Sequence, residues 1–498
     1  DTLLEKSAGV WARYWEESDV QIEGDADFDQ LAVRFALYHL NIMVKHDDDR
    51  VGIGAKALTG EGYKGHSFWD TEMFILPYFT FTRPETARTL LQYRYRNLYG
   101  AHLKAKECGY EGAMYPWECA WVDDGEVTPL YMGADIVTGK ITKVWTGLIE
   151  HHISADIAYA VQQYADVTGD TDYMERCGYE IILDTALFWA SRVQWNEERG
   201  RYEILDVIGP DEYKEHVDNN AYTNYMAHYN MRMALDVMAQ LETQGGETYE
   251  RLNKKLDFAA LRAKINACID KIYLPVPNEN GIVPQFDGYL SLTPLDLTKY
   301  KSGDAVLGIY NDYNTEQLNH YMVSKQADTV MLFFLLDELF DFETKKKNFV
   351  FYEDKTLHDS SLSKCTHAIL ACDYGMEDMA YNLYRRALTI DLGPYMKSSN
   401  EGIHSASTGG IWESTVMGFG GVRMKKGGLT IAPRLPKVWK TLSFPLVYQG
   451  ATLRVRADHH VVCVENHGKH AVELTLCGER VTVAPGRCVE KRTEGQAQ

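Results

Sequence analysis

Apolar residues recur at helical spacing along most of the chain, up to about Gly420. In residues 26–44 the positions that share one helical face are Val33, Leu37, Leu40 and Val44. Residues 326–340 are apolar almost all round, as in a helix buried on every side. Similar patterns recur between these segments without a fixed-period repeat, so the sequence predicts a mainly helical region that is not a solenoid.

The connections between the predicted helices are unusually long. Three of them span residues 52–70, 109–147 and 398–413, and the opening stretch is a fourth. Connections of this length inside a compact domain usually carry function. Together they predict a helical barrel whose loops gather at one mouth.

After about Gly420 the pattern changes to alternation with period two. Short runs such as "ATLRVRAD" and "AVELTLCG" are bounded by Gly, Pro or Asp, as strands are. The sequence therefore predicts a helical barrel followed by a small antiparallel β-sandwich. We expect a linker helix over 1–25, the barrel over 26–423 and the β-sandwich over 424–498.

Composition and charge exclude several classes of partner. The 498 residues carry a formal charge of −20, which argues against nucleic acid or an anionic membrane surface. No apolar run approaches the length that spans a bilayer. The first residues contain neither a signal peptide nor a start methionine, and we expect the chain to be a piece of a longer protein.

Cysteines and aromatic residues add two further expectations. The nine cysteines are scattered without CxxC pairs, which implies neither a disulfide framework nor a zinc site and favours a cytoplasmic protein. The 32 Tyr, 17 Phe and 10 Trp suit stacking against sugar rings, although a large helical core also uses aromatics.

The stretch "GPDEYKEHVDNNAYTN", residues 209–224, places two acids directly after a Gly-Pro turn. A carboxyl group held there among aromatic residues has a raised pKa and can protonate a glycosidic oxygen. Glu212 is the candidate for this acid. The alternative is that Asp211 and Glu212 are acids at a helix N-terminus, where they interact favourably with the helix dipole.

Two further pairs of residues could recognise a sugar. Trp69 and Asp70 in "HSFWDTE" combine a stacking face with a carboxylate that accepts hydrogen bonds from hydroxyl groups. Lys325 and Gln326 stand at the head of the predicted helix that is apolar almost all round, and they could reach the same hydroxyls. A buried Trp in a first helical turn and a solvated Lys-Gln pair are the structural alternatives.

Two hydroxyl-rich loops are candidate anion sites. In "EGIHSASTGG", the polar side chains of His404, Ser405 and Ser407 lie among glycines whose backbone N–H groups can face an anion. "TLHDSSLS", residues 356–363, is a similar loop that includes Ser361. A flexible Gly/Ser loop has the same composition.

The remaining candidate residues are better explained by packing than by metal binding or catalysis. The pairs His151–His152 and His459–His460 lack the spacing and acidic partners of a metal site, and we expect no metal. Cys119 has no activating base near it in sequence, and we expect a buried thiol.

Taken together, these stretches resemble glycoside hydrolase family 65, the family of inverting phosphorylases of α-linked glucosides and some hydrolases. The matching stretches occur in the family's order and cover nearly the whole chain: "GEGYKGHSFWDTE", "GAMYPWE", "HISADIAYA", "IGPDEYKEHVDNNAYTN", "KQAD", "TLHDSSLS" and "EGIHSASTGG". The resemblance implies a mainly α fold, an (α/α)6 barrel with a C-terminal β-sandwich. The family's N-terminal β-sandwich is not seen in this chain.

The resemblance also implies roles for individual residues. It makes Glu212 the general acid and assigns glucose recognition to Trp69, Asp70, Lys325 and Gln326. It assigns phosphate binding to His404, Ser405 and Ser407, with Ser361 as an addition. Trp117 and Glu118 begin a loop, up to His152, that is expected to shape the subsite of the leaving group.

The expected reaction needs phosphate as co-substrate and no cofactor. Because phosphate is already an anionic nucleophile, a phosphorylase can dispense with the base that an inverting hydrolase needs. The 117–152 loop looks closer to that of the family's kojibiose and glucosylglycerol phosphorylases than to that of its maltose phosphorylases. The resemblance therefore favours an α-1,2-linked substrate, kojibiose or 2-O-α-glucosylglycerol. Phosphorolysis would give β-glucose 1-phosphate, and we expect a homodimer.

Several alternatives remain at this point. A maltose, trehalose or nigerose phosphorylase would share the same fold. An inverting α-glucosidase would need a second carboxylate opposite Glu212, and only Glu401 and Glu413 lie near the anion loop. We expect neither to act as a base. A carbohydrate-binding protein without turnover, or a helical scaffold, would leave Glu212 or the Gly/Ser/His loop unexplained.

Overall fold

The structure, a computed structural model, describes residues 2–301, 308–393 and 400–493. Six inner helical segments form a closed ring in which each contacts the next and the last contacts the first again. They are α3 (Leu76–Thr82), α7 (Ile153–Thr168), α10 (Ala221–Gln244), α15 (Thr329–Leu335), α17 (Ser363–Asp373) and α19 (Ser405–Glu413). A π-helical turn, Thr71–Ile75, runs directly into α3.

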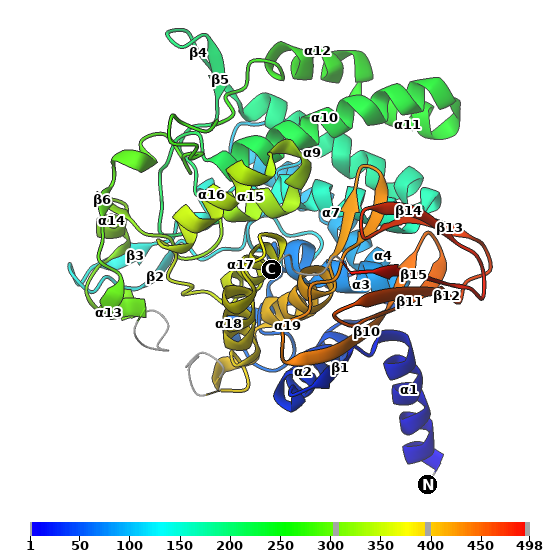
Figure 1. Cartoon of the computed structure of the whole chain (residues 1–498). Helices are drawn as coiled ribbons and strands as arrows, with labels where there is room; N and C mark the ends of the chain where they lie inside the picture. The colour runs from blue at the N-terminus through cyan, green and yellow to red at the C-terminus, as the bar shows by residue number, and fades with distance from the viewer. Residues whose placement is uncertain (1, 302–307, 394–399, 494–498) are drawn as a thin grey trace.

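A second set of helices packs outside this ring (Figure 1). They are α2 (Asp27–Ile42) on α19, α4 (Pro84–Arg96) on α3, α9 (Tyr179–Arg192) on α7 and α10, α12 (Phe258–Cys268) on α9 and α10, α16 (Phe342–Glu353) on α15, and α18 (Glu377–Leu388) on α17. Six inner and six outer helices make the (α/α)6 barrel, which confirms the expected fold.

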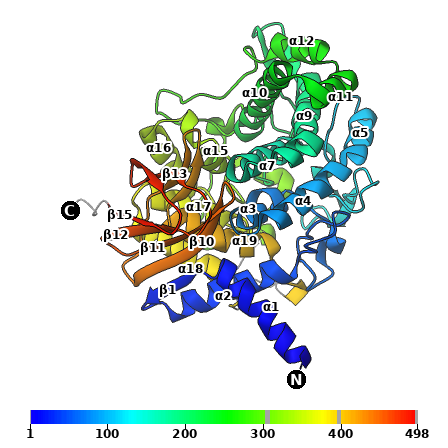
Figure 2. The same ribbon diagram turned by 90° about the vertical axis from the view of Figure 1, so that its right-hand side faces the viewer.

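The other helices connect or extend the barrel. They are α1 (Thr2–Ser18), α5 (Leu98–Glu107), α6 (Thr146–Ile149), α8 (Thr171–Tyr173), α11 (Gly246–Leu256), α13 (Thr298–Lys301) and α14 (Thr315–Leu318). Figures 1 and 2 show α1 projecting away from the body of the molecule, whereas α11 and α12 lie at the opposite end.

The predicted helical faces are the ones that are buried. In α2, Val33, Leu37 and Leu40 have no exposed surface, as the spacing predicted. In α15, the residues from Thr329 to Phe333 are all buried. Burial of such apolar stripes against a neighbouring helix stabilises each element more than its intrinsic propensity does.

The C-terminal part forms two sheets that pack on one side of the barrel (Figure 2). The five-stranded sheet has the order β1-β10-β11-β12-β15 and the four-stranded sheet the order β14-β13-β9-β8. The strands are β1 (Gln21–Gly24), β8 (Val422–Lys425), β9 (Gly428–Ile431), β10 (Trp439–Tyr448), β11 (Ala451–Ala457), β12 (Val461–Asn466), β13 (Val472–Leu476), β14 (Glu479–Val483) and β15 (Cys488–Arg492). In β11 the alternate residues Leu453, Val455 and Ala457 are buried, which is the predicted period of two.

This region differs from the expectation in two details. Strand β1 comes from the N-terminal segment, where the sequence predicts only a linker helix, and pairs antiparallel with β10. Strands β9 and β13 pair in parallel, so the sheets are antiparallel with one exception. Both details depend on contacts between distant segments, which a local alternation pattern does not encode.

Three short two-stranded ribbons lie in the connections of the barrel. They are β2 (Tyr131–Ala134) with β3 (Ile141–Lys143), β4 (Gln194–Asn196) with β5 (Arg201–Glu203), and β6 (Thr293–Pro294) with β7 (Tyr321–Met322). The long connection of residues 109–147 thus contains a hairpin. Within the described residues, none of the helices combines the length and apolarity needed to cross a membrane.

The cysteine expectation needs one correction. Cys463 and Cys488 form a disulfide between the neighbouring strands β12 and β15. They are 25 residues apart in sequence, and only the strand pairing brings them together. Cys119 is buried as expected, and burial raises the pKa of its thiol to about 11.

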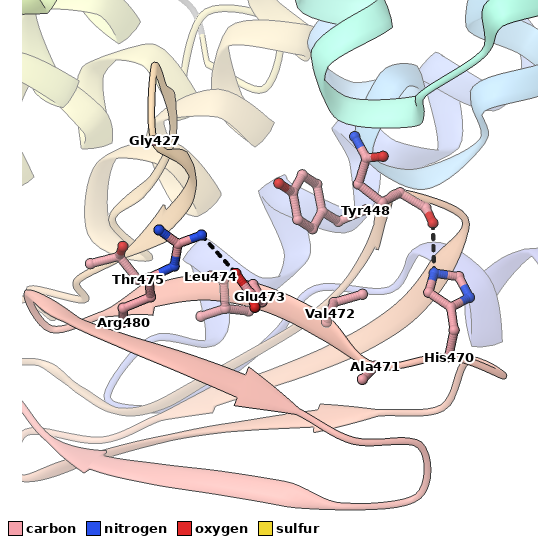
Figure 3. Close-up of a pocket in the computed structure, with 10 residues that line it drawn as sticks. Gly427, Tyr448, His470, Ala471, Val472, Glu473, Leu474, Thr475 and Arg480 are labelled. Carbon is pink, nitrogen blue, oxygen red and sulfur yellow. Dashed lines mark hydrogen bonds and ion pairs between the residues drawn. The ribbon is translucent and has the colours of Figure 1, made fainter.

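A cavity of about 280 Å³ lies in the C-terminal region (Figure 3). Its wall includes Tyr448, His470, Glu473 and Arg480. The Arg480 guanidinium donates to the Glu473 carboxylate at 2.6 Å, and the His470 ring contacts the backbone oxygen of Gln449 at 2.8 Å. None of the sequence-predicted site residues lines this cavity.

Candidate active site

The candidate site residues gather at one end of the barrel, where the inner helices begin. Asp70 precedes the π-turn that leads into α3, His152 precedes α7, and the Glu212 turn leads into α10. Lys325 precedes α15, Ser361 precedes α17 and His404 precedes α19. Six helix N-termini at one mouth provide backbone N–H groups and a favourable dipole for an anion.

The turn that carries Glu212 is fixed by close polar contacts. A Cβ at Gly209 would lie 2.3 Å from Asn220 Nδ2 and 2.5 Å from Asp328 Oδ2, so only glycine fits there. Asn220 accepts from the N–H of Thr223 at the start of α10 and donates to Asp328 at 2.9 Å. Asn220 and Asp328 thus link the turn to the starts of α10 and α15.

Glu212 lies directly beside Lys325 and Gln326. Lys325 Nζ donates to Glu212 Oε1 at 2.9 Å, and Gln326 Nε2 donates to Pro210 O at 2.6 Å. The side chains of Glu212 and Lys325 keep 28% and 20% of their surface exposed, so both can meet a ligand. Burial opposes the lysine charge, but the Glu212 carboxylate holds the pKa of Lys325 above its ordinary range.

Asp211 has a structural role in the same turn. It is buried, accepts from the backbone N–H of Lys325 at 2.8 Å and from Gln285 Nε2 at 3.0 Å. Burial raises the pKa of this carboxyl group. Asp211 therefore fixes Lys325 beside Glu212, and it is not the helix N-terminal acid of the alternative interpretation.

Trp69 and Asp70 form the wall next to this turn. The Trp69 ring is buried and packs edge to face on the His152 ring with centroids 4.8 Å apart. Burial, followed by the charge of Glu212, raises the pKa of Asp70 to about 7, whereas Lys325 lowers it. Asp70, Glu212 and Lys325 are thus close enough to influence one another's charge.

Trp117 and Glu118 lie beside Trp69. The rings of Trp117 and Trp69 are 6.5 Å apart, and the His66 ring contacts the Glu118 carboxylate at 2.7 Å. Backbone hydrogen bonds between Ser67 and Cys119 join the two loops in both directions. The resulting aromatic wall continues from Trp69 into the loop that the sequence assigns to the leaving group.

The His404 segment is not the flexible loop of the alternative interpretation, because Ser405 begins helix α19. The His404 N–H and ring both contact Asp391, and Lys56 Nζ lies 3.1 Å from His404 Nε2. Ser405 is buried and its hydroxyl donates to the backbone oxygens of Gly54 and Ala55. A lysine, a histidine and a helix N-terminus therefore meet at this point.

Ser407 lies in the first turn of α19. Its side chain is buried, and its hydroxyl finds no hydrogen-bond partner among the described residues. A buried hydroxyl without a protein partner is unfavourable unless water or a ligand binds it. Ser407 is therefore a better candidate for contact with an anion than Ser405, whose hydroxyl is already bonded.

The loop that carries Ser361 is attached to the Glu212 turn. The Asp359 N–H donates to the backbone oxygen of Lys325 at 3.1 Å, and the Tyr213 hydroxyl donates to Asp359 Oδ2 at 2.6 Å. Ser361 itself is partly exposed. The Ser361 loop is therefore held at the same mouth as the turn that carries Glu212.

Sequence reasoning missed several residues of this site. Lys56 beside His404 follows a glycine-rich segment, but nothing in the pattern distinguishes it from a solvated lysine. His152 was interpreted as a packing residue, and its ring does pack on Trp69, yet both its nitrogens also contact carboxylates, of Glu150 and Asp156. The i, i+4 spacing of His152 and Asp156 on one helix could have indicated this contact.

A possible metal-binding group includes a residue of the loop that carries Ser361. Glu353, His358 and His367 bring their donor atoms within 4.8 Å of one another. The Glu353 carboxylate contacts both imidazole rings, and this explains the cluster without an ion. It braces the start of the loop that carries Ser361.

Comparison with known proteins identifies the family. The model of the glycosyl hydrolase family 65 central catalytic domain matches residues 34–413, and that of the family's C-terminal domain matches residues 422–483. The chain belongs to glycosyl hydrolase family 65. The resemblance inferred from the motifs is therefore confirmed.

The similar relatives include kojibiose phosphorylases. That of Halothermothrix orenii is 49% identical over 93% of this chain and 59% of its own length, and that of Escherichia coli is 42% identical over 97% and 62%. A solved structure from the human microbiome, provisionally named a kojibiose phosphorylase, superimposes with a TM-score of 0.90 at 27% identity, covering 100% of this chain and 70% of that one. The chain spans about three fifths of the length of these curated relatives.

Proposed function

We propose that the chain carries the catalytic site of an inverting phosphorylase that cleaves an α-1,2-linked glucoside, kojibiose, with inorganic phosphate. The products are β-glucose 1-phosphate and glucose. The observation that carries this proposal is the partly exposed acid Glu212, which lies beside Lys325 and Gln326 at the mouth where the inner helices begin. The similarity to kojibiose phosphorylases supports the linkage.

Each step of the reaction has a residue suited to it. Glu212 donates its proton to the glycosidic oxygen as the bond to the anomeric carbon breaks. Trp69 offers an apolar face to the donor glucose, and Asp70, Lys325 and Gln326 bind its hydroxyl groups. Phosphate attacks the opposite face of the anomeric carbon, which inverts its configuration from α to β.

Phosphate would be held by the N-terminus of α19 and its neighbours. Lys56 supplies positive charge and the first-turn N–H groups of α19 supply donors, while Ser407 and Ser361 supply hydroxyl groups. His404 lies between Lys56 and Asp391 at the start of this helix. Ser405 orients the helix, because its hydroxyl is bonded to the backbone of Gly54 and Ala55. Phosphate is a co-substrate, and we propose no cofactor.

A hydrolase on the same fold would need an ionised base opposite Glu212. Glu413 is buried inside α19, and burial raises the pKa of its carboxyl group well above the ordinary value. Glu401 is exposed. Glu413 therefore lacks the ionised carboxylate that would activate a water molecule, which favours phosphorolysis.

The acceptor is tested with a panel of glucosides. The protein is incubated with phosphate and, in separate reactions, kojibiose, nigerose, trehalose, maltose or 2-O-α-glucosylglycerol, and the release of glucose 1-phosphate is measured. We expect the highest kcat/KM with kojibiose. A higher value with any other substrate would contradict the linkage, and a higher value with glucosylglycerol would keep the α-1,2 linkage but change the leaving group.

A further inference from the structure

His152 lies between the aromatic side chains of the candidate site. The centroid of its ring is 4.8 Å from that of Trp69, 5.4 Å from that of Trp117 and 5.3 Å from that of Tyr222. The ring planes cross at 73°, 75° and 85°, the edge-to-face arrangement that aromatic pairs favour. One imidazole thus packs against aromatic rings from three different segments of the chain.

Buried hydrogen bonds fix the orientation of the His152 ring. Its Nδ1 lies 2.6 Å from Asp156 Oδ2, and its Nε2 lies 3.2 Å from Glu150 Oε1. The Tyr222 hydroxyl donates to the other oxygen of Asp156 at 2.8 Å. His152, Asp156 and Glu150 have no exposed surface. The imidazole therefore cannot turn without leaving buried polar groups unpaired, which is costly.

The two neighbouring acids favour a positively charged imidazole. Burial opposes a charge on His152, but Asp156 and then Glu150 raise the pKa of this residue to about 10. A protonated imidazole donates from both ring nitrogens, so each acid accepts one hydrogen bond. Hydrogen bonds between charged partners are stronger than those between neutral ones, which makes His152 a firm support.

The rings of Trp69 and Trp117 have little freedom of their own. They keep only 2% and 5% of their surface exposed, and their centroids lie 6.5 Å apart. Trp69 also packs on Phe74, and Trp117 on Phe68. Because so little of each ring is accessible, its orientation decides which part can meet a ligand. His152 packs on both rings and therefore influences both orientations.

We propose that His152 is a positioning residue for glucoside binding: it holds Trp69 and Trp117 at a fixed angle, so that the donor subsite and the leaving-group subsite share one aromatic wall. This inference rests on the proposed function and on the expected role of the 117–152 loop. His152 acts through the two tryptophans. A change at His152 therefore weakens the binding of the glucoside and leaves the phosphate site at the start of α19 as it is.

The first test compares the KM for kojibiose with the KM for phosphate in His152→Gln. Glutamine removes the ring, while its amide can still donate to one of the two acids. We expect the KM for kojibiose to rise about three- to ten-fold, as for the loss of one edge-to-face ring contact, and the KM for phosphate to stay at the native value.

The neighbouring His151 provides the matched control. It is also buried, but its ring packs on Phe188 and its nitrogens contact Leu148 and Arg192. None of these three residues is a candidate for substrate binding. His151→Gln should therefore leave both KM values native.

Double-mutant cycles show whether His152 acts through the tryptophans. Trp69→Leu and Trp117→Leu remove one ring each and are combined in turn with His152→Gln. If His152 positions a ring, its replacement has a smaller effect on the KM for kojibiose once that ring is absent. Additive effects in both cycles would overturn the proposal.

Fluorine NMR of protein labelled with 5-fluorotryptophan gives a readout that needs no substrate. Trp69→Phe and Trp117→Phe assign the two signals. In His152→Gln we expect both signals to shift, while those of Trp189 and Trp439, buried elsewhere in the fold, stay in place and show that the variant is folded.

Asp156→Asn is the second variant should His152→Gln fold poorly. It keeps the imidazole ring but removes the charge of the acid that lies 2.6 Å from Nδ1. We expect smaller changes in the same direction, both in the fluorine signals of Trp69 and Trp117 and in the KM for kojibiose.

Equal increases in the KM for kojibiose and for phosphate would overturn the positioning role, and so would unmoved fluorine signals of Trp69 and Trp117. A native protein that does not cleave kojibiose with phosphate would instead refute the proposed function. The fluorine spectra would then still decide whether His152 holds the two tryptophans in place.

Discussion

At Glu212 the structure places the candidate acid beside a cation and an amide. Lys325 Nζ donates to Glu212 Oε1 at 2.9 Å, and Gln326 Nε2 lies 3.4 Å from the same oxygen. A general acid must hold its proton in the free enzyme and give it up in the transition state. The residue-scale predictions below change Glu212, Ser407 and Asp70 in turn.

Replacing Glu212 by Gln keeps the shape of the side chain and removes the proton that the leaving oxygen needs. We expect kcat for phosphorolysis of kojibiose to fall by about 10²- to 10⁴-fold, the usual contribution of general acid catalysis. The KM for kojibiose should change little. Glu215→Gln, three residues further along, is the matched control, and turnover at a native rate in Glu212→Gln would refute the assignment.

Replacing Ser407 by Ala removes the buried hydroxyl at the N-terminus of α19. A hydrogen bond to a charged group contributes about 1.5–3 kcal/mol, so we expect the KM for phosphate to rise about ten-fold or more. The KM for kojibiose should stay close to native. Steady-state kinetics with each substrate varied in turn separates the two effects, and an unchanged KM for phosphate would remove Ser407 from the phosphate site.

The raised pKa of Asp70 predicts a pH-dependent gain in stability for Asp70→Asn. Its carboxyl group has a pKa of about 7 in the fold against an ordinary value of 3.8. Between these values the folded state binds more protons than the unfolded chain, so stability falls as the pH rises through this window. Asp70→Asn should therefore unfold a few degrees above the native protein at pH 8 and at the same temperature at pH 4. A difference that does not vary with pH would contradict this account.

At the scale of elements, the important features are the starts of the inner helices and the turns that lead into them. All six inner helices begin at the same mouth, and each connection that enters this mouth carries at least one candidate residue. These side chains are therefore held in place because they lie at the starts of rigid helices. Short polar contacts hold the turns that lead into these helices. Gly209, which opens the Glu212 turn, is one position where an added Cβ would collide with such a contact.

Replacing Gly209 by Ala should displace the Glu212 turn. The added methyl group would lie 2.3 Å from Asn220 Nδ2, and both that amide and Asp328 would have to move. We expect a loss of at least about ten-fold in kcat, since small displacements of a catalytic group have large effects on rate. Gly9→Ala on the projecting helix α1 meets no neighbour within 4 Å and is the control. Native activity in Gly209→Ala would show that the turn tolerates movement.

Much of the arrangement of helices, strands and connections could be predicted from the sequence. The helical periodicity of residues 26–44 and the alternation after Gly420 indicated the elements, and the long connections indicated the mouth. The start of α19 at Ser405 could not be predicted, because the glycines and serines of its first turns hide the apolar spacing that indicates a buried helix. Lys56 was missed because its importance arises from its contact with His404, far away in the sequence. The paired Cys463 and Cys488 were missed for the same reason.

At the scale of the whole molecule, the barrel and the two C-terminal sheets pack together (Figures 1 and 2). Strand β10 contacts α3 and α7, two helices of the inner ring. The roles of the individual site residues, the domain bounds, the expected homodimer and the cytoplasmic location remain predictions. Family membership and the (α/α)6 barrel are shown, and the proposed reaction follows from where the barrel places Glu212.

The most direct test of the account is the reaction of kojibiose with and without inorganic phosphate, followed by proton NMR from the first turnovers. We expect β-glucose 1-phosphate and glucose in equal amounts when phosphate is present, and no cleavage when it is absent. The α anomer would contradict inversion. Free glucose formed without phosphate would contradict phosphorolysis and would require a base opposite Glu212.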